Sequence, residues 1–386
     1  MRLEDVCTVF TDGDWIESKD QSEKGIRLIQ TGNIGEGLYL EKESRAKYIS
    51  EDTFKKLKCT EIFPGDILVS RLPEPIGRAC IVPERTGRMI TAVDCTICRP
   101  DETLISKEYL CYFMQSNAYY TRLLANVTGT TRKRISRKNL GNVELEVPTK
   151  EEQNTIVERL DCLVKVIDSR TKELQLLDNL IKARFVELFG DMFLNPNGWE
   201  KALLGEACDV RDGTHDSPKY FTEGYPLVTS KNVTGGKIDF TDCSLISEED
   251  YNKINQRSKV DMGDILMPMI GTVGNPVIVD VEAEFAIKNV ALIKFRENSI
   301  VINSFVKALL ESDYFDRAVI SNVRGGTQKF ISLGDIRKLE ISLPPIDVQE
   351  QFDDFVKQVD KSKVVVQEAL DKTQLLFDSL MQKYFG

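Results

Sequence analysis

Hydrophobic residues recur at heptad spacing along one uninterrupted stretch, residues 151–189. They stand at Ile156, Leu160, Leu163, Ile167, Leu174, Leu177, Ile181 and Leu188. This spacing forms a narrow apolar seam, which is typical of a helix that pairs with another helix. No proline or glycine interrupts the stretch. At about 1.5 Å per residue the pattern predicts a rod on the order of 55 Å long, and so long a helix needs a partner.

A second stretch, residues 347–385, repeats this pattern when the sequence is shifted by 196 residues. Its apolar positions are Phe352, Val356, Val359, Leu370 and Phe377. Polar residues interrupt the two seams at different places, for example Arg184 in the first and Lys363 in the second, and such interruptions often fix the register of a coiled coil. We therefore predict that the two helices pair. The alternative is that each helix packs only on its neighbouring domain.

The helices belong to a longer internal repeat with a period of 196 to 199 residues. Gly-Asp-Ile-Leu stands at 65–68 and again at 263–266. Short runs rich in Val, Ile and Leu predict strands, and helix-like stretches lie at 106–124 and 303–320. The predicted fold class is α+β, with two tandem mixed α/β domains, each followed by a long helix. The predicted boundaries are 1–150, 151–190, 191–346 and 347–386.

Composition is that of an ordinary globular protein, with 386 residues, 41% of them hydrophobic and 29% charged. The N-terminus has no basic start followed by an apolar core, and no apolar run reaches 18 residues, so we expect a cytoplasmic protein without a membrane partner. Nine cysteines, an odd number, suit a reducing compartment. The net charge of −10 is uneven: residues 1–150 hold 23 basic and 22 acidic residues, and 191–346 hold 17 and 23. Any nucleic-acid contact must therefore be a focused patch.

Signals for catalysis are weak. His215 is the only histidine, and no phosphate-binding glycine loop is present, so we assign no catalytic, cofactor-binding or metal-binding residue. A lone Cys95-x-x-Cys98 pair is weak evidence for a metal site. The repeat aligns its two cysteines with Val290 and Ile293, which predicts that they are core residues of a strand.

A basic loop is the stronger signal. The candidate residues are Thr130, Thr131, Arg132, Lys133 and Arg134, next to a glycine turn. Arginine and lysine in such a loop suit phosphates, and arginine can bond guanine with two hydrogen bonds. The corresponding residues of the second copy are Thr327, Gln328 and Lys329, and glutamine suits adenine. Two domains that recognise different DNA sequences would show this pattern of equivalent loops with different side chains. The alternative is that each loop is only a solvated charged turn.

Two further loops are candidates because binding residues often collect on loops held by strands. One contains Thr214, His215, Lys219 and Tyr220. The other is the turn after each Gly-Asp-Ile-Leu strand, with Ser70, Arg71 and Arg78 in the first copy and Gly271 and Thr272 in the second. Plain turns without a binding role are the alternative for both.

In this combination the chain resembles the specificity subunit of Type I restriction-modification systems, over nearly its whole length. The resemblance rests on the two tandem domains, each followed by a long helix, and on motifs in a fixed order. These are Gly-Asp-Ile-Leu at 65–68 and 263–266, Asn-Pro-Asn-Gly-Trp at 195–199, Asp-Gly-Thr-His-Asp-Ser-Pro at 212–218, and the helix entries from Pro148 to Gln153 and from Pro344 to Gln349.

The resemblance implies a non-catalytic chain that binds double-stranded DNA. By this resemblance each domain would be a target-recognition domain for one half of a split, asymmetric target, and the helices would form an antiparallel spacer. Two modification subunits would bring S-adenosylmethionine and methylate adenine at N6. Restriction subunits would bring ATP and Mg, and whether two of them are present stays open. The first copy has Asp-Gly-Asp-Trp at 12–15 in place of the Gly-Thr-His-Asp-Ser-Pro segment, so the two halves should read different sequences.

Two other functions stay open on the sequence alone. One is a coiled-coil scaffold that binds proteins and no DNA, which the paired loops with different tips disfavour. The other is a self-contained DNA methyltransferase, which the missing cofactor motifs disfavour.

Overall fold

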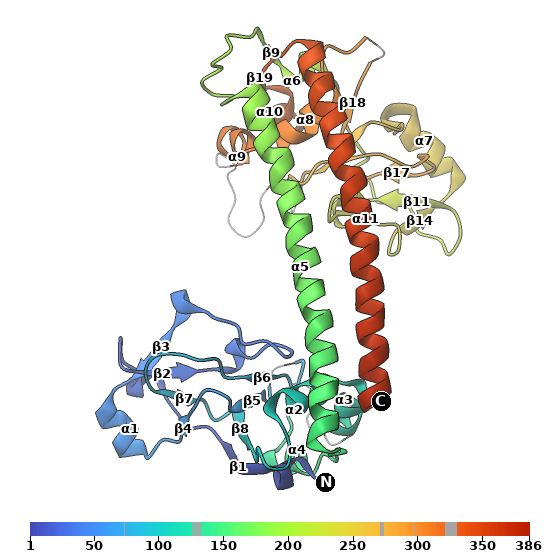
Figure 1. Cartoon of the computed structure of the whole chain (residues 1–386). Helices are drawn as coiled ribbons and strands as arrows, with labels where there is room; N and C mark the ends of the chain where they lie inside the picture. Colours follow the sequence, from blue (N-terminus) through green and yellow to red (C-terminus); the bar gives the residue numbers. More distant parts are fainter. Residues whose placement is uncertain (73, 126, 128–132, 271–273, 297, 321–329) are drawn as a thin grey trace. The chain divides into compact units, whose positions relative to one another are not determined.

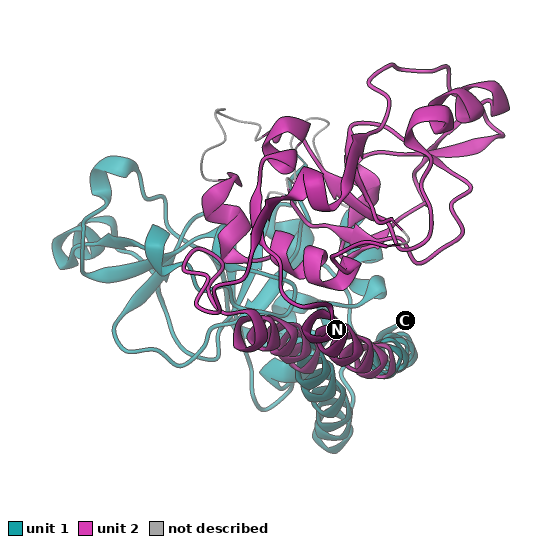
Figure 2. Ribbon diagram, turned by 90° about the horizontal axis from the view of Figure 1, so that it is seen from above, with its two compact units in different colours: residues 1–171, 368–386 teal, residues 172–367 magenta. Residues whose placement is uncertain are grey.

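The computed structural model describes the chain except residues 73, 126, 128–132, 271–273, 297 and 321–329. The chain forms two compact units (Figure 2). Unit 1 comprises Met1–Thr171 and Glu368–Gly386, and unit 2 comprises Lys172–Gln367. Each unit therefore contains one globular domain together with part of each long helix. Among the described residues, no helix is long and apolar enough to cross a membrane.

Unit 1 contains two four-stranded sheets (Figure 1). The first sheet is antiparallel and has the order β1 (Cys7–Asp12), β8 (Cys95–Pro100), β5 (Ile67–Ser70), β6 (Ala79–Ile81). The second has the order β3 (Lys47–Ile49), β2 (Ile26–Ile29), β7 (Met89–Thr91), β4 (Glu61–Ile62), with β2 and β7 parallel. The short helices of this unit are α1 (Glu51–Leu57), α2 (Lys107–Phe113), α3 (Asn117–Leu124) and α4 (Arg137–Gly141).

Unit 2 repeats this plan. Its antiparallel sheet has the order β10 (Asp209–Asp212), β18 (Val290–Lys294), β15 (Ile265–Pro268), β16 (Val277–Ile278), and its second sheet has the order β14 (Ser244–Ile246), β11 (Tyr225–Val228), β17 (Ala286–Ile287). Two strand pairs are added, β12 (Val233–Thr234) with β13 (Lys237–Ile238) and β19 (Glu340–Ser342) with β9 (Lys201–Leu203). The helices are α6 (Leu204–Ala207), α7 (Glu248–Ser258), α8 (Asn303–Leu310), α9 (Asp313–Ala318) and α10 (Leu333–Arg337).

The repeat holds at the level of strand register. Ile67 of β5 stands opposite Cys98 of β8, and Ile265 of β15 stands opposite Ile293 of β18. All four side chains are fully buried. Cys95 is buried as well, so the prediction that the Cys-x-x-Cys pair belongs to the core of a strand is confirmed.

The two long helices are α5 (Lys150–Phe189) and α11 (Ile346–Phe385), each 40 residues long. In unit 1 the start of α5 packs against the end of α11, where the Arg159 guanidinium donates a 2.8 Å hydrogen bond to the Tyr384 hydroxyl. In unit 2 the end of α5 packs against the start of α11, with the Phe185 and Phe352 ring centroids 5.7 Å apart. These contacts confirm antiparallel pairing in each unit.

The predicted seam residues are buried or half-buried. Three of them join the core of unit 1, namely Ile156, Leu160 and Phe377, and three join the core of unit 2, namely Ile181, Phe352 and Val356. Val359 is buried, and the others are half-buried: Leu163, Ile167, Leu174 and Leu370. The alternative, that each helix packs on its neighbouring domain, is also correct in part. For example, the ring centroids of Phe189 in α5 and Phe305 in α8 lie 4.8 Å apart.

Both helix-like stretches are broken, which corrects the prediction of one continuous helix in each copy. The first divides into α2 and α3, and the second into α8 and α9. Ser116 causes the first break, because its side chain accepts a 3.1 Å hydrogen bond from the Tyr119 amide and so caps the start of α3.

A buried glutamine fastens the start of each long helix to its domain. The Gln153 side chain accepts a hydrogen bond from the Ser106 amide and donates to the Leu104 and Pro148 carbonyls, at 2.8 to 2.9 Å. The same three bonds recur in unit 2, where Gln349 bonds the backbone of three residues at 2.8 to 3.0 Å: Ile302, Ile300 and Pro344. Both glutamines are fully buried, so each helix leaves its domain in a fixed direction.

Candidate nucleic-acid interface

The loop that follows β1 brings a charged cluster together in unit 1. Asp12 ends the strand and accepts a 3.0 Å hydrogen bond from the Thr96 hydroxyl. Two arginines pair with its carboxylate, Arg71 at 3.3 Å and Arg137 at 3.8 Å. Gly13 comes next, and a Cβ there would overlap the Thr91 carbonyl oxygen. The loop is thus pressed against the backbone beside β7, and only glycine fits.

Asp94, in the turn between β7 and β8, holds the basic segment against this loop. Its carboxylate pairs with Arg134 at 3.1 Å, and its carbonyl accepts a hydrogen bond from the Arg71 amide. About half of the Arg134 side chain stays exposed, as does that of Lys133, which pairs with Glu74 at 2.9 Å. The cations predicted from the sequence are therefore anchored at one side and open to solvent at the other.

Unit 2 builds the same loop with different side chains. Gly213 follows Asp212, and a Cβ at this glycine would overlap the Ile287 carbonyl oxygen, as at Gly13. The backbone contacts match as well: the Gly13 amide donates to the Cys95 carbonyl at 2.9 Å, and the Gly213 amide donates to the Val290 carbonyl at 3.1 Å. The loop backbone is therefore duplicated, although its side chains are not.

His215 stands at the centre of the unit 2 loop. Its Nδ1 lies 2.8 Å from the Asn289 side-chain oxygen, and its Nε2 lies 2.9 Å from the Asp212 carboxylate. Asp212 is buried and also pairs with Arg257, whereas 64% of the His215 side chain is exposed. The hydrogen bonds to Asn289 and then to Asp212 raise the pKa of His215 above its usual value.

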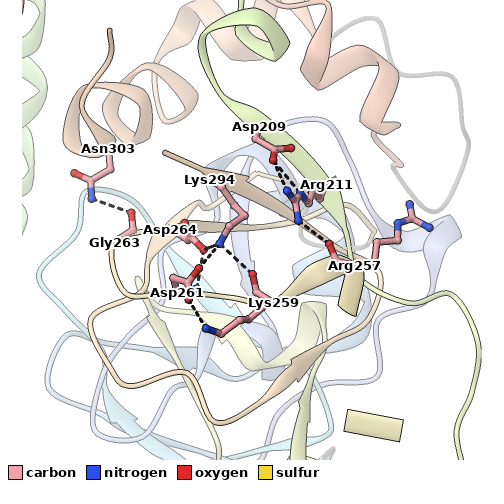
Figure 3. Close-up of polar contacts among 9 residues, drawn as sticks. All are labelled: Asp209, Arg211, Arg257, Lys259, Asp261, Gly263, Asp264, Lys294 and Asn303. Atoms are coloured by element: carbon pink, nitrogen blue, oxygen red, sulfur yellow. Dashed lines mark hydrogen bonds and ion pairs between the residues drawn. The ribbon is translucent and has the colours of Figure 1, made fainter. Parts of the chain in front are cut away.

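A contact to the backbone carbonyl of Arg257, the partner of Asp212, holds the end of α7 (Figure 3). Arg211 on β10 donates a 2.9 Å hydrogen bond to the Arg257 carbonyl, and Arg211 itself pairs with Asp209. The same view shows Lys294 bonded to Asp264, both next to the Gly-Asp-Ile-Leu strand β15. The Arg211 bond joins the end of α7 to strand β10 of the first sheet.

A polar cavity of about 330 Å³ lies between the 213–218 loop and α7. On the helix side it is lined by Asp250, Lys253 and Arg257. Beyond the loop, Lys219 is exposed and Tyr220 is 56% exposed. All four residues predicted in this loop, namely Thr214, His215, Lys219 and Tyr220, therefore lie on one short segment at the end of the sheet.

The turn after β5 places its predicted residues largely inside the domain. Ser70 is fully buried and donates to the Leu72 carbonyl, and Arg71 is only 4% exposed and bonds the Val93 carbonyl and Asp12. The half-buried Arg78 donates to the carbonyls of Ile34 and Thr31. Ser70 and Arg71 thus bond to protein oxygens inside the domain, and direct DNA contact by either residue stays a prediction.

Several predicted contacts lie outside the described residues. They are Thr130, Thr131 and Arg132 in the first copy, and Gly271, Thr272, Thr327, Gln328 and Lys329 in the second. For these residues the DNA contacts stay predictions.

The structure adds site residues that sequence reasoning missed. Asp94 and Asn289 hold Arg134 and His215, and the repeat aligned the two positions without showing their role. Trp15 is 69% exposed on the unit 1 loop, which is unusual for so large a side chain. The only sequence signal for Trp15 as a site residue was a tryptophan within a polar loop. Among the described residues, no group of three His, Cys, Asp or Glu is placed to hold a metal ion.

Comparison with known proteins identifies the family. The model of the Type I restriction modification DNA specificity domain matches residues 1–179 and 196–372, once for each copy of the repeat. The chain belongs to this family. The first match covers the whole predicted domain 1–150, and the second covers 191–346 except its first five residues. Each match also extends over most of the helix that follows, so the family domain corresponds to the repeated module.

Individual relatives are distant. The chain is 23% identical over 298 residues to the EcoBI specificity subunit of Escherichia coli, a match that covers 69% of this chain and 63% of that protein. It is 23% identical over 318 residues to the EcoKI specificity subunit of Escherichia coli, covering 75% and 67%. It is 23% identical over 352 residues to the MjaIX specificity subunit of Methanocaldococcus jannaschii, covering 83% and 77%. The matches thus span about two thirds to three quarters of these relatives.

Solved structures share the fold. A chain from a study of complex assembly and conformational transition of the type I R-M system aligns over 100% of this chain and 96% of its own, with a TM-score of 0.58 and 19% identity. The S subunit from M. genitalium aligns over 100% and 95%, with a TM-score of 0.53 and 16% identity. At these identities the likeness is one of fold.

Proposed function

We propose that this chain is the DNA-specificity subunit of a Type I restriction-modification complex, in which each unit reads one half of a bipartite, asymmetric target. One observation carries the proposal. The loop after β1 and the loop after β10 share their backbone contacts, yet the neighbouring turn holds Arg134 through Asp94 in unit 1 and His215 through Asn289 in unit 2. A shared scaffold with different side chains is what two readers of different sequences require.

The chemistry of the exposed groups supports this reading. Arg134 in unit 1 and Lys219 in unit 2 present cations to solvent, and cations attract the phosphate backbone of DNA. Trp15 in unit 1 and Tyr220, which follows Lys219 in unit 2, present exposed rings that can contact thymine methyl groups or insert between base steps. The overall charge of −10 favours contacts at focused basic patches over contacts across the whole surface.

We propose further that the chemistry belongs to partner subunits and that this chain is non-catalytic. Two modification subunits would bind S-adenosylmethionine and transfer the methyl group to adenine N6, and restriction subunits, where present, would use ATP and Mg. The long helices offer surface for such partners. Several apolar side chains along them are more than half exposed: Leu176, Val364, Val365 and Leu375. Apolar residues exposed in this way often mark interaction sites.

The test is sequence-specific binding by the chain together with its modification subunit. Binding to duplex DNA should weaken steeply with salt, because phosphate contacts release counterions. Methylated sites sequenced from cells that express both proteins should show two fixed half-sites separated by unread base pairs. Methylation without any common motif would refute the proposal, as would methyl transfer by the chain alone.

A further inference from the structure

The two units differ in the chemistry that anchors their exposed cation. In unit 1 the carboxylate of Asp94 holds the Arg134 guanidinium. In unit 2 the repeat places an uncharged amide at the same turn, and Asn289 holds the His215 imidazole. A guanidinium keeps its proton throughout the physiological pH range, whereas an imidazole gains or loses one within it.

The charge of each cluster follows from its members. Unit 1 joins three guanidinium groups to two carboxylates, a fixed net charge of about +1, and the groups are Arg71, Arg134, Arg137, Asp12 and Asp94. Unit 2 joins Arg257 and His215 to the single carboxylate of Asp212. Its net charge is therefore about zero when the imidazole is neutral and about +1 when it is protonated.

The geometry around His215 favours the protonated ring. Both ring nitrogens face oxygen atoms, the Asn289 amide oxygen at 2.8 Å and the Asp212 carboxylate at 2.9 Å. A neutral imidazole has one N–H and can satisfy only one of these acceptors, whereas the imidazolium satisfies both. Asp212 is buried and is held by Arg257 as well, so it stays in place as an acceptor.

Other charged groups around the loop nearly balance one another. Asp216 of the loop lines the same cavity as Asp250 and Lys253 of α7. Lys288, next to Asn289, donates a 2.6 Å hydrogen bond to the Ser217 hydroxyl. Two carboxylates and two ammonium groups thus surround the site. The charge of Arg257 lowers the pKa of His215, and the charge of Asp212 raises it.

We infer that protonation of His215 adds one positive charge to those, such as Lys219, that unit 2 presents to the DNA backbone, so that recognition of its half-site weakens as pH rises while recognition by unit 1 does not. Asn289 is the positioning residue for this charge. The inference rests on the proposed function. It adds that recognition of one half of the bipartite target depends on pH and recognition of the other half does not.

The protonation itself can be measured without DNA. His215 is the only histidine in the chain, so the imidazole resonances of the isotope-labelled full chain report this ring alone. We expect a titration midpoint above 6.5, the ordinary value for histidine. Asn289→Asp places a second carboxylate against the ring and should raise the midpoint by about one to three pH units. The control Asn252→Asp adds the same charge at an exposed position on α7 and should shift it far less. A midpoint at or below 6.5 in the wild type would overturn the inference.

The consequence for recognition is measured on the complex with the modification subunit. Between pH 6 and pH 9 the slope of log affinity against log salt should fall by about 0.9, the loss of one phosphate contact. His215→Gln should show the lower slope at both pH values. Equal slopes for the wild type at both pH values would overturn the inference alone. Absence of sequence-specific binding at every pH would overturn the proposed function, and the inference with it.

Discussion

Gln349 gives the most direct test of how each long helix is fixed to its domain. Its fully buried side chain makes three hydrogen bonds, with the Ile302 amide and with the carbonyls of Ile300 and Pro344, at 2.8 to 3.0 Å. Gln349→Ala removes all three hydrogen bonds. It leaves the backbone N–H of Ile302 and the backbone carbonyls of Ile300 and Pro344 with fewer partners. Each lost bond costs about 1 kcal/mol, and an orphaned buried group costs about 1 to 3 kcal/mol. The expected loss in the free energy of unfolding is therefore about 3 to 5 kcal/mol.

Gln351→Ala is the matched control, because Gln351 lies two residues further along the same helix and is exposed. For a unit of this size, 1 kcal/mol corresponds to roughly 2 to 4 °C in Tm. Calorimetry of the full chain should then show a transition lowered by about 6 °C or more for Gln349→Ala, and nearly unchanged for Gln351→Ala. Gln153→Ala should act in the same way on unit 1. Equal Tm values for Gln349→Ala and Gln351→Ala would show that the buried glutamine does not hold the helix.

Three further predictions concern the interface and the spacer. Arg134→Ala should change the bases read in one half-site of the methylated motif, while the exposed control Arg45→Ala leaves both halves unchanged; sequencing of methylated sites checks this. Gly213→Ala should destabilise unit 2 by about 1 to 3 kcal/mol, because a Cβ there meets the Ile287 carbonyl, and Gly334→Ala, which meets only ordinary contacts, should not; urea unfolding compares them. Deleting one matched heptad from both long helices should shorten the spacer between half-sites by about three base pairs, since seven residues span roughly 10 Å. An unchanged spacer would show that the helices do not set it.

The repeat is the feature that the sequence predicted best. Spacing alone aligned Cys98 with Ile293, and the two occupy the same position in the strand ladder. The heptad seam likewise marked the two long helices to within one residue of their ends. Both patterns arise from burial that repeats at a fixed interval, which a linear sequence records directly.

The candidate site was harder to predict, because its contacts join residues far apart in the chain. Arg134 meets Asp94 across 40 residues, and His215 meets Asn289 across 74. Arg71 shows a different difficulty. An arginine in a turn suggests an exposed cation, yet protein oxygens surround its guanidinium inside the domain. Which cations face solvent depends on where the fold places their acceptors, and the sequence pattern does not contain that information.

The central claim is that each unit reads its own half of one DNA target. Methylated sites should be sequenced from cells that express the modification subunit with the wild type, with Arg134→Ala or with Tyr220→Ala. We expect a bipartite motif in which Arg134→Ala alters one half and Tyr220→Ala alters only the other. An unsplit motif, or two variants that change the same half, would contradict it.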